Sequence, residues 1–332
     1  RKHNADWGVV VISDVSTGRI LVLADSGSTT PDAAKPQSVM GVQSPYEPGS
    51  VGKLLTVASA LEKGTTTPTS QYTVPYSINP SDAGGPIKDL HEHGTETLTS
   101  TGILAESSNV GTIEIGEQVG DRDRYDFMTK MGLNQLTGIE LAGESQGIMR
   151  DFDNIQGRDR YTMMFGQSYA LTAVQQNQII QAIGNRGVMI APRIIDSTID
   201  SQGRAEKATA PQPKQVMSAD RSKELITMME SVVTDELGTG QTAKVEGYRI
   251  AVKTGTADIK VNGADAVVSN TAGLIPAESP RLAISVVLYN PRVGGLSSDS
   301  AAPLWGEVAT EAVRNLGIPA STETAQLYPT RP

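Results

Sequence analysis

The stretch Tyr46-Glu47-Pro48-Gly49-Ser50-Val51-Gly52-Lys53-Leu54-Leu55 is the part of the sequence around which the rest of the chain is organised. Pro48 and Gly49 interrupt the preceding segment, and a helical pattern of apolar residues follows them. The residues of that apolar helix face are Val51, Leu54, Leu55 and Ala58. We therefore expect Ser50 in the first helical turn, where backbone N–H groups lack partners, with Lys53 on the same side of the helix.

A serine hydroxyl beside a lysine amine is a nucleophile–base pair, provided that the amine can lose its proton. The plain alternative is that Ser50 is a helix N-cap and Lys53 a solvated lysine, because Ser-x-x-Lys is common by chance. The catalytic interpretation therefore depends on other stretches that supply the remaining parts of a site.

Two such stretches follow along the chain. Ser107-Ser108-Asn109 lies 107 − 50 = 57 residues after Ser50, between apolar helical segments. Lys253-Thr254-Gly255-Thr256 lies 253 − 107 = 146 residues further, at the end of a predicted strand. Alone, the first is equally typical of a helix kink and the second of a hairpin turn on an edge strand. Together and in this order, the three stretches match the motif set of penicillin-binding proteins and β-lactamases.

Acyl transfer explains why these residue types are needed. Ser50 would attack the substrate carbonyl, and Lys53 would accept its proton if burial and a nearby cation, Lys253, favoured the neutral amine. Ser107 would relay the proton to the leaving amine. Asn109 offers a donor and an acceptor to the substrate amide and to Lys53.

The remaining residues of the third stretch fit the other end of the substrate. The N–H groups of Ser50 and Thr256 would form the oxyanion hole. The hydroxyls of Thr254 and Thr256 would hold a terminal carboxylate. Gly255 would let the substrate backbone lie close to the strand.

The sequence resembles the transpeptidase domain of class B penicillin-binding proteins over nearly its whole length, nearest the septal type of actinobacteria. The matching stretches are Asp6-Trp7, Tyr46 to Ser50, His91-Glu92-His93-Gly94, Ser107 to Gly111, Gly143-Glu144-Ser145, Phe165 to Ser168, Lys253 to Ala257 and Ala301 to Leu304. Gly52 departs from the pattern, because relatives usually carry a bulkier residue there, and helix propensity falls by about 1 kcal/mol with glycine. This leaves the packing beneath the serine to be explained.

Strand-like segments lie at both ends of the sequence and helical ones in the middle, which predicts an α+β fold. We expect a five-stranded antiparallel sheet from about residues 6–25 and 246–316, covered by the first and last helices, and a second, mainly helical lobe from about 65–240. A cleft would separate the two parts. The transpeptidase domain would span residues 1–318, followed by a flexible tail over 319–332.

The amino-acid composition argues against several other kinds of ligand and chemistry. The 332 residues carry 28 basic and 37 acidic side chains, a net charge of −9, with no long basic run, so nucleic acid is not the expected ligand. The absence of cysteine excludes disulfides and thiolate chemistry. No apolar run approaches the roughly 20 residues of a membrane-spanning helix. The sequence starts at Arg1 without a signal peptide, so we expect any membrane anchor to lie upstream.

A metal site is not expected. His91 and His93 form a short His-Glu-His stretch, which lacks a third ligand and is better interpreted as a surface loop or a stem-peptide contact. No cofactor is expected either.

The resemblance implies a peptidoglycan D,D-transpeptidase that takes D-Ala-D-Ala stem peptides, is acylated by β-lactam antibiotics and works outside the cell membrane. Its partners would be division or cell-wall synthesis proteins such as a glycosyltransferase. The alternatives are a D,D-carboxypeptidase, a serine β-lactamase, or a sensor that β-lactams acylate without turnover. Class A β-lactamases carry a glutamate for deacylation; the nearest candidate by order along this chain is Glu144, without the expected motif around it.

Overall fold

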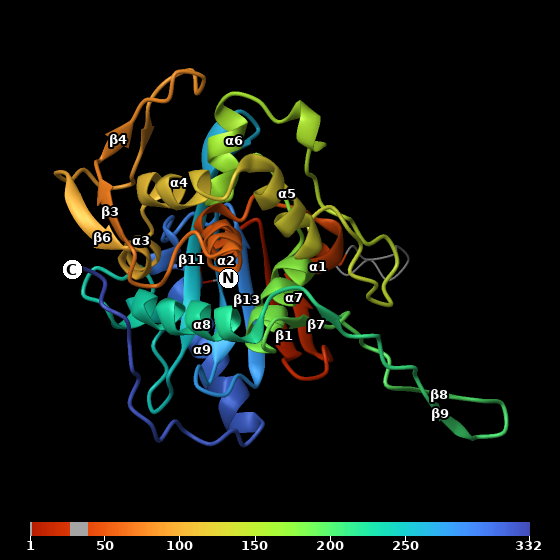
Figure 1. Ribbon diagram of the computed structural model, residues 1–332. Helices are drawn as coiled ribbons and strands as arrows, with labels where there is room; N and C mark the ends of the chain where they lie inside the picture. The colour runs from red at the N-terminus through yellow and green to blue at the C-terminus, as the bar shows by residue number, and fades with distance from the viewer. Residues whose placement is uncertain (1, 27–38) are drawn as a thin grey trace.

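A five-stranded antiparallel sheet is the centre of the fold in the computed structural model, which describes residues 2–26 and 39–332 (Figure 1). The strand order is β11-β12-β13-β1-β2. The bounds are β1 Trp7–Asp14, β2 Ile20–Asp25, β11 Ala251–Val261, β12 Ala264–Ile275 and β13 Leu282–Tyr289. The predicted α+β class and the pairing of the N-terminal hairpin with three C-terminal strands are confirmed.

The junction between β1 and β13 joins the two ends of the chain. Their antiparallel register runs from Trp7 opposite Tyr289 to Asp14 opposite Leu282, and the two aromatic rings stack with centroids 4.9 Å apart. Every residue of β13 before Tyr289 is buried, because helices cover both faces of the sheet. This explains the almost continuous apolar sequence of that strand.

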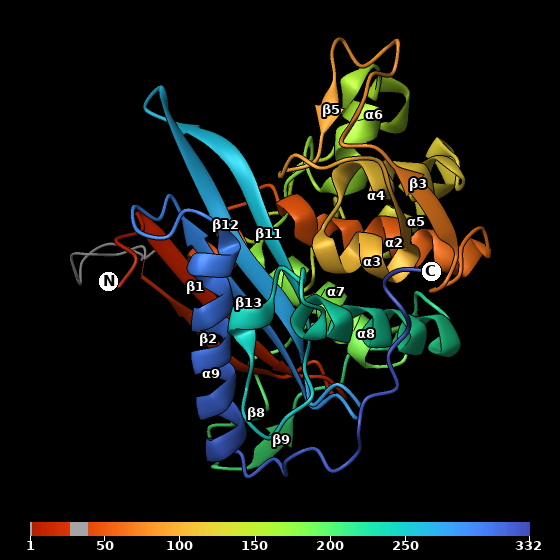
Figure 2. The same cartoon turned by 90° about the vertical axis from the view of Figure 1, so that its left-hand side faces the viewer.

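Three helices cover the sheet. On one face α9 (Ala301–Asn315) is fixed by its buried Trp305, whose indole N–H donates to the carbonyl of Ile284 at 3.0 Å. On the other lie α7 (Ala173–Gly184) and α8 (Ala219–Thr234), as Figure 2 shows. Asn177 of α7 donates to the carbonyl of Ala283 at 2.9 Å, so its buried amide has a partner in the sheet.

One expectation about this layer was wrong. We expected the helix that follows Ser50 to cover the sheet, but that helix, α2 (Lys53–Lys63), packs among helices of the second lobe. Its neighbours there are α3 (Ser100–Glu106), α4 (Asn109–Glu117) and α5 (Asp121–Lys130). The physical reason is that α2 is buried nearly all round, whereas α7 carries Asn177, whose amide bonds to carbonyls of β1 and β13.

Residues in the left-handed conformation mark two helix ends in this lobe. Gly64 ends α2 with φ 74°, as is usual for a glycine that follows a helix. The helical segment from residue 99 to 120 is broken at Ser107, which has φ 64° and separates α3 from α4.

Short elements complete the chain, and the β8–β9 hairpin projects from the body of the protein (Figure 1). Their bounds are α1 Met40–Gln43, η1 Gly49–Gly52, β3 Gln71–Val74, β4 Ser77–Ile78, β5 Ile87–Lys88, β6 Glu96–Thr99, η2 Phe152–Asn154, α6 Arg158–Thr162, η3 Met163–Phe165, β7 Val188–Met189, β8 Ser197–Ile199, β9 Ala205–Lys207, β10 Lys214–Gln215, η4 Gln241–Ala243 and η5 Ser297–Asp299. Within the described ranges, no helix has the length and apolar character needed to cross a membrane.

The segment after α9, for which we expected flexibility over residues 319–332, runs back along the protein and ends beside α3 (Figure 2). The carbonyl of Thr330 accepts a hydrogen bond from the N–H of Thr99 at 3.0 Å, and Tyr328 packs against the hydrophobic core. The flexibility of this segment and the domain limits at 1–318 stay predictions, and these contacts argue against free motion of residues 328–331.

Candidate active site

A cleft of about 1030 Å³ lies between the helical lobe and the edge strand β11. The predicted site residues that line it are Ser50, Ser107, Asn109, Thr254, Gly255 and Thr256. Lys53 and Lys253 are fully buried next to it. The three stretches singled out in the sequence therefore converge on one place.

Ser50 lies in η1, the single turn that leads into α2. The turn is fixed by Gly49, which has φ 51° and donates its N–H to the carbonyl of Gly166 at 2.9 Å. A Cβ at Gly49 would lie 2.4 Å from the carbonyl oxygen of Thr256, so only glycine allows this approach to β11. The same approach brings the backbone of Thr256 next to the start of the Ser50 turn.

Gly52, the departure from the family pattern, is explained by its neighbours. A Cβ at this position would lie 2.3 Å from the hydroxyl oxygen of Tyr169 and 2.5 Å from Cα of Gly166. The buried phenol of Tyr169 therefore occupies the space in which a side chain at position 52 would lie. The packing beneath Ser50 is dense rather than weakened.

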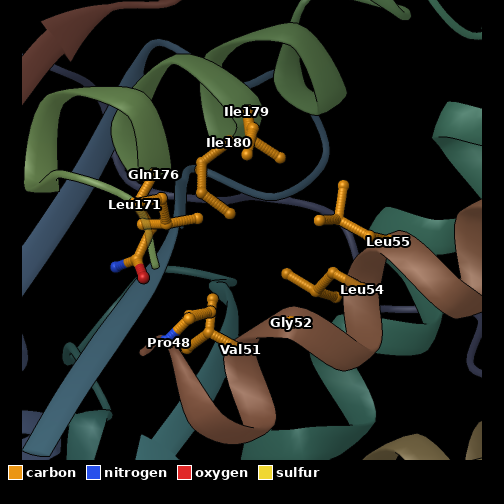
Figure 3. Close-up of a pocket in the computed structure, with 9 residues that line it drawn as sticks. All are labelled: Pro48, Val51, Gly52, Leu54, Leu55, Leu171, Gln176, Ile179 and Ile180. Atoms are coloured by element: carbon orange, nitrogen blue, oxygen red, sulfur yellow. The ribbon is translucent and has the colours of Figure 1, made fainter. Parts of the chain in front are cut away.

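Next to this contact, a small cavity of about 10 Å³ separates α2 from α7 (Figure 3). Its walls are mainly aliphatic and come from both helices and from the segments that precede them. They include Val51, Leu54, Leu55, Leu171, Ile179 and Ile180. Apolar side chains of α2 and α7 thus face each other across this cavity, and Ser50 lies in the turn that precedes α2.

Both buried lysines meet at Ser107. The ammonium group of Lys53 donates to Ser107 Oγ at 3.1 Å and also to the carbonyl of Ser107. Lys253 Nζ donates to the same Oγ at 2.9 Å and to the carbonyl of Thr254 at 3.1 Å. This arrangement brings two amines and one hydroxyl into contact from three different elements.

Burial changes the acid–base behaviour of both amines. Loss of solvation lowers the pKa of Lys53 to about 7, while the charge of Asp89 acts in the opposite direction. Burial, together with the positive charge of Lys53, holds the pKa of Lys253 well below its ordinary value. A neutral lysine is therefore accessible near neutral pH, which is the condition that a lysine base requires.

Asn109 is the first residue of α4, and its side-chain amide donates to the carbonyl of Lys88 at 2.9 Å. Among the described residues, no hydrogen bond joins Asn109 to Lys53. Its expected contacts with the substrate amide and with Lys53 stay predictions.

Asp89, which was not among the predicted site residues, organises this part of the cleft. Its Oδ1 accepts hydrogen bonds from the backbone N–H groups of Asn109 at 2.5 Å and Val110 at 3.0 Å. Its Oδ2 accepts from Ser108 Oγ at 2.7 Å and faces His93 Nε2 at 3.1 Å. A carboxylate at a helix N-terminus is favourable, because the backbone donors and the helix dipole both favour negative charge. No sequence pattern links Asp89 to Asn109, which lies twenty residues later.

Two further residues of the cleft were missed, because each lies far along the chain from its partner. Thr239 shares a hydrogen bond of 2.6 Å between hydroxyl oxygens with Thr254. The N–H of Ser297 donates to Thr256 Oγ1 at 3.1 Å. These contacts orient the two threonine hydroxyls that we expect to hold a carboxylate.

The packing of β11 requires a glycine at position 255, in addition to the expected closeness of a substrate backbone. A Cβ there would lie 2.4 Å from the carbonyl oxygen of Pro48 and 2.9 Å from Asn270 Nδ2. Asn270 donates that amide to the Pro48 carbonyl at 3.0 Å. The missing side chain thus allows β11 to contact the Ser50 segment; closeness to a substrate backbone stays a prediction.

His91 lies at the cleft surface, and His93 contacts acidic groups. Asp89 and Glu96 lie on either side of the His93 ring, with the carboxylate of Glu96 3.2 Å from Nδ1. Within the described part of the chain, no group of three histidine, aspartate or glutamate side chains has the geometry of a metal site. The absence of a metal requirement stays a prediction.

Comparison with known proteins adds an independent result. Residues 8–310 match the family model described as the penicillin binding protein transpeptidase domain. Penicillin-binding protein PbpB of Mycolicibacterium smegmatis is 35% identical over 94% of this chain and 51% of its own length. Peptidoglycan D,D-transpeptidase FtsI of Escherichia coli K12 is 32% identical over 95% of this chain and 53% of its own. The chain thus spans about half the length of these relatives.

Solved structures with the same architecture include a peptidoglycan synthetase from Bifidobacterium adolescentis, with a TM-score of 0.91 and 34% identity over 98% of this chain and 60% of that one. Penicillin binding protein 3 of Mycobacterium tuberculosis in complex with aztreonam gives a TM-score of 0.90 and 32% identity over 99% of this chain and 76% of that one. The predicted fold is confirmed by these similarities.

Proposed function

Because this chain belongs to the penicillin-binding protein transpeptidase family, we propose that it is a serine D,D-transpeptidase that cross-links peptidoglycan stem peptides ending in D-Ala-D-Ala. The observation that carries the proposal is the meeting of Lys53 and Lys253 at Ser107 Oγ in a cleft that Ser50 lines. That set provides a nucleophile, a base of suitable pKa and a route for the proton.

Acylation begins when Ser50 Oγ attacks the carbonyl of the penultimate D-alanine, and Lys53 takes the hydroxyl proton. The N–H groups of Ser50 and Thr256 stabilise the oxyanion, while Thr254 and Thr256 hydroxyls hold the terminal carboxylate. The C–N bond then breaks, a proton passes through Ser107 to the leaving amine, and D-alanine departs.

Deacylation reverses these steps with an amine as the second substrate. The acceptor amine of another stem peptide attacks the acyl–Ser50 ester and loses a proton to the same lysine base. The new amide is released, and the Ser50 hydroxyl is restored.

The arrangement of carboxylates favours this reaction over hydrolysis. Glu144, the nearest candidate by chain order for a deacylation base, bonds to the N–H groups of Thr137 at 2.7 Å and Gly138 at 3.3 Å and lies outside the cleft lining. In the cleft, Asp89 caps α4, and Glu96 and Glu106 face Arg331. The fourth carboxylate of the lining, Asp258, is exposed on β11, two residues beyond Thr256. We propose that none of these carboxylates activates water at the acyl group, so that general-base assistance of roughly 10²–10⁴-fold is missing from hydrolysis.

The first experiment locates the acyl group. A penicillin should add its full mass once, on the peptide that contains Ser50, and Ser50→Ala should take up none. An adduct on another residue, or one that survives in Ser50→Ala, contradicts the assignment.

The second experiment separates the alternatives. We expect the penicilloyl adduct to persist for minutes to hours, and an amine acceptor to release a stem-peptide acyl group faster than water does. Turnover of penicillin at about 1–10³ per second would favour a β-lactamase. Release of D-alanine to water alone would favour a carboxypeptidase, and acylation without any peptide turnover would favour a sensor.

The relatives support a proposal for the biological setting. Similarity to FtsI of E. coli and to PbpB of two mycobacterial species supports a septal role for this domain, in a protein anchored to the outer face of the cell membrane. A glycosyltransferase of cell-wall synthesis is the partner that we propose, since cross-linking needs newly made glycan strands. β-Lactam antibiotics would be inhibitors, and aztreonam is bound in the M. tuberculosis structure.

A further inference from the structure

The segment from Pro329 to Arg331 lies along helix α3, whose C-terminal end carries Ser107 (Figure 2). Thr99, the N-cap of α3, donates its hydroxyl to the carbonyl of Pro329 at 2.7 Å and its N–H to that of Thr330 at 3.0 Å. The same hydroxyl accepts from the N–H of Gly102 at 3.0 Å. The cap of α3 is therefore bonded both to its own helix and to this distant segment.

The surface of α3 is shaped for this contact. A Cβ at Gly102 would lie 2.1 Å from the carbonyl oxygen of Thr330, so glycine is the residue that allows the segment to lie against the helix. Thr330 is held from its other side by a hydrogen bond of 2.7 Å from its hydroxyl to Asp235. Asp235 directly follows α8, so Thr330 links α3 to the helix that covers the sheet.

Arg331 reaches the opposite end of α3. Its guanidinium contacts Glu106 Oε1 at 2.6 Å and Glu96 Oε2 at 3.1 Å. Glu106 is the last residue of α3, directly before Ser107, and its side chain is 15% exposed. A carboxylate at a helix C-terminus is unfavourable without a cation beside it, because the helix dipole is negative there. Arg331 supplies that cation.

These contacts tie residues 329–331, which we name the brace, to both ends of α3. A helix of seven residues spans about 10 Å, so one segment with one long side chain can cover it. Ser107, in the left-handed conformation, depends on its neighbours for its position because that conformation is strained for a residue other than glycine.

We propose that the brace positions Ser107 for proton transfer, and that Arg331 is a positioning residue that acts through Glu106. The inference rests on the proposed function, because it takes Ser107 to be the proton relay. Arg331 touches no reacting atom. It holds the end of α3 so that Ser107 Oγ faces Lys53 and Lys253.

The test measures the acylation rate constant and the dissociation constant for a penicillin separately. Arg331→Ala should lower the rate constant about tenfold, less than the ~100-fold that a misplacement of 1 Å can cause, with the dissociation constant nearly unchanged. Arg331→Lys should recover part of the rate, because the charge stays and the two-pronged contact is lost. Arg204→Ala is the matched control, since Arg204 forms an exposed ion pair with Asp200 on the β8–β9 hairpin.

A double-mutant cycle with Glu106→Gln tests whether Arg331 affects the acylation rate constant through Glu106. Since Arg331 acts through Glu106, the effects should be far from additive, and Glu106→Gln/Arg331→Ala should acylate faster than Arg331→Ala alone. Gly102→Ala should reproduce the loss by displacing Thr330. Additive effects, or a lower melting temperature with an unchanged acylation rate constant, would overturn the proposal that the brace positions Ser107. Failure of the unaltered protein to acylate Ser50 would instead overturn the proposed function.

Discussion

Lys53 and Lys253, two hundred residues apart in the chain, donate hydrogen bonds to one oxygen atom, Ser107 Oγ, at 3.1 and 2.9 Å. Two buried ammonium groups at one acceptor repel each other, so the pair favours a state in which one amine is neutral. This relationship makes the acid–base chemistry of the cleft measurable by pH.

The rate of acylation by a penicillin should rise with pH through about 7, where burial places the pKa of Lys53. The neutral amine accepts the Ser50 proton, and the charged amine does not. The rate constant measured from pH 5.5 to 8.5 checks this. A profile that is flat across this range would exclude Lys53 as the base.

The free energy of unfolding should also depend on the ionisation of Lys53. Since its pKa is about 7 in the folded protein and about 10.4 in the unfolded chain, the unfolded state binds more protons between these values, and the stability contribution of Lys53 rises with pH across that window. Below pH 7 the cost of charging a buried amine is fully present. Urea unfolding of the protein and of Lys53→Met at pH 7 and 9 should show the difference shifting in favour of lysine at the higher pH.

Lys53→Arg should be nearly inert in acylation although the positive charge is kept, because arginine does not release its proton. The position is helical and arginine is a good helix former, but the larger guanidinium must fit a fully buried site, so circular dichroism should accompany the assay. Lys63→Arg, at the exposed end of the same helix, is the control and should acylate normally. Near-normal acylation by Lys53→Arg would mean that only a cation is needed.

Asp89→Asn should slow acylation and destabilise the protein by about 1–3 kcal/mol, because an amide cannot accept from all the donors that face the carboxylate. Denaturant unfolding and the acylation rate measure the two effects. Asp265→Asn, which breaks only an exposed ion pair with Lys260, should change neither. Equal results for the two variants would exclude a special role of Asp89.

Gly52→Ala should be destabilising although alanine is the better helix former. The gain of about 1 kcal/mol in propensity is offset by the contacts of the added methyl with Tyr169 and Gly166, since overpacking costs about 1–3 kcal/mol. Tyr169→Phe in the same chain should restore only part of the loss, because Gly166 stays in place. The control is Gly295→Ala, where an added Cβ meets no atom within 4 Å. A stability above that of the unaltered protein would contradict this account.

Chelation should leave the acylation rate unchanged, since neither His91 nor His93 belongs to a metal-ligand cluster in the described part of the chain. The rate measured before and after treatment with a chelator, with zinc added back, checks this. A large loss that zinc restores would reveal a metal requirement.

The sequence by itself determined the fold class and indicated the candidate site residues. Strand-like segments at both ends of the chain predicted the sheet, and Ser50, Ser107 and Lys253 stood in recognisable local patterns. The helix ends at Gly64 and at Ser107 reflect backbone preferences that act within a few residues. Such features are local, so they can be predicted from neighbouring residues alone.

Only the tertiary structure decided which distant groups meet. Asp89 beneath α4, Thr239 beside Thr254, the phenol of Tyr169 against Gly52, and Arg331 on Glu106 join residues far apart in the chain, and none belongs to a periodic pattern. The lowered pKa of Lys53 depends on burial, which is fixed only when the lobe closes over the sheet. Packing and electrostatics act across space rather than along the sequence, and for that reason the chemistry of the cleft followed from the fold.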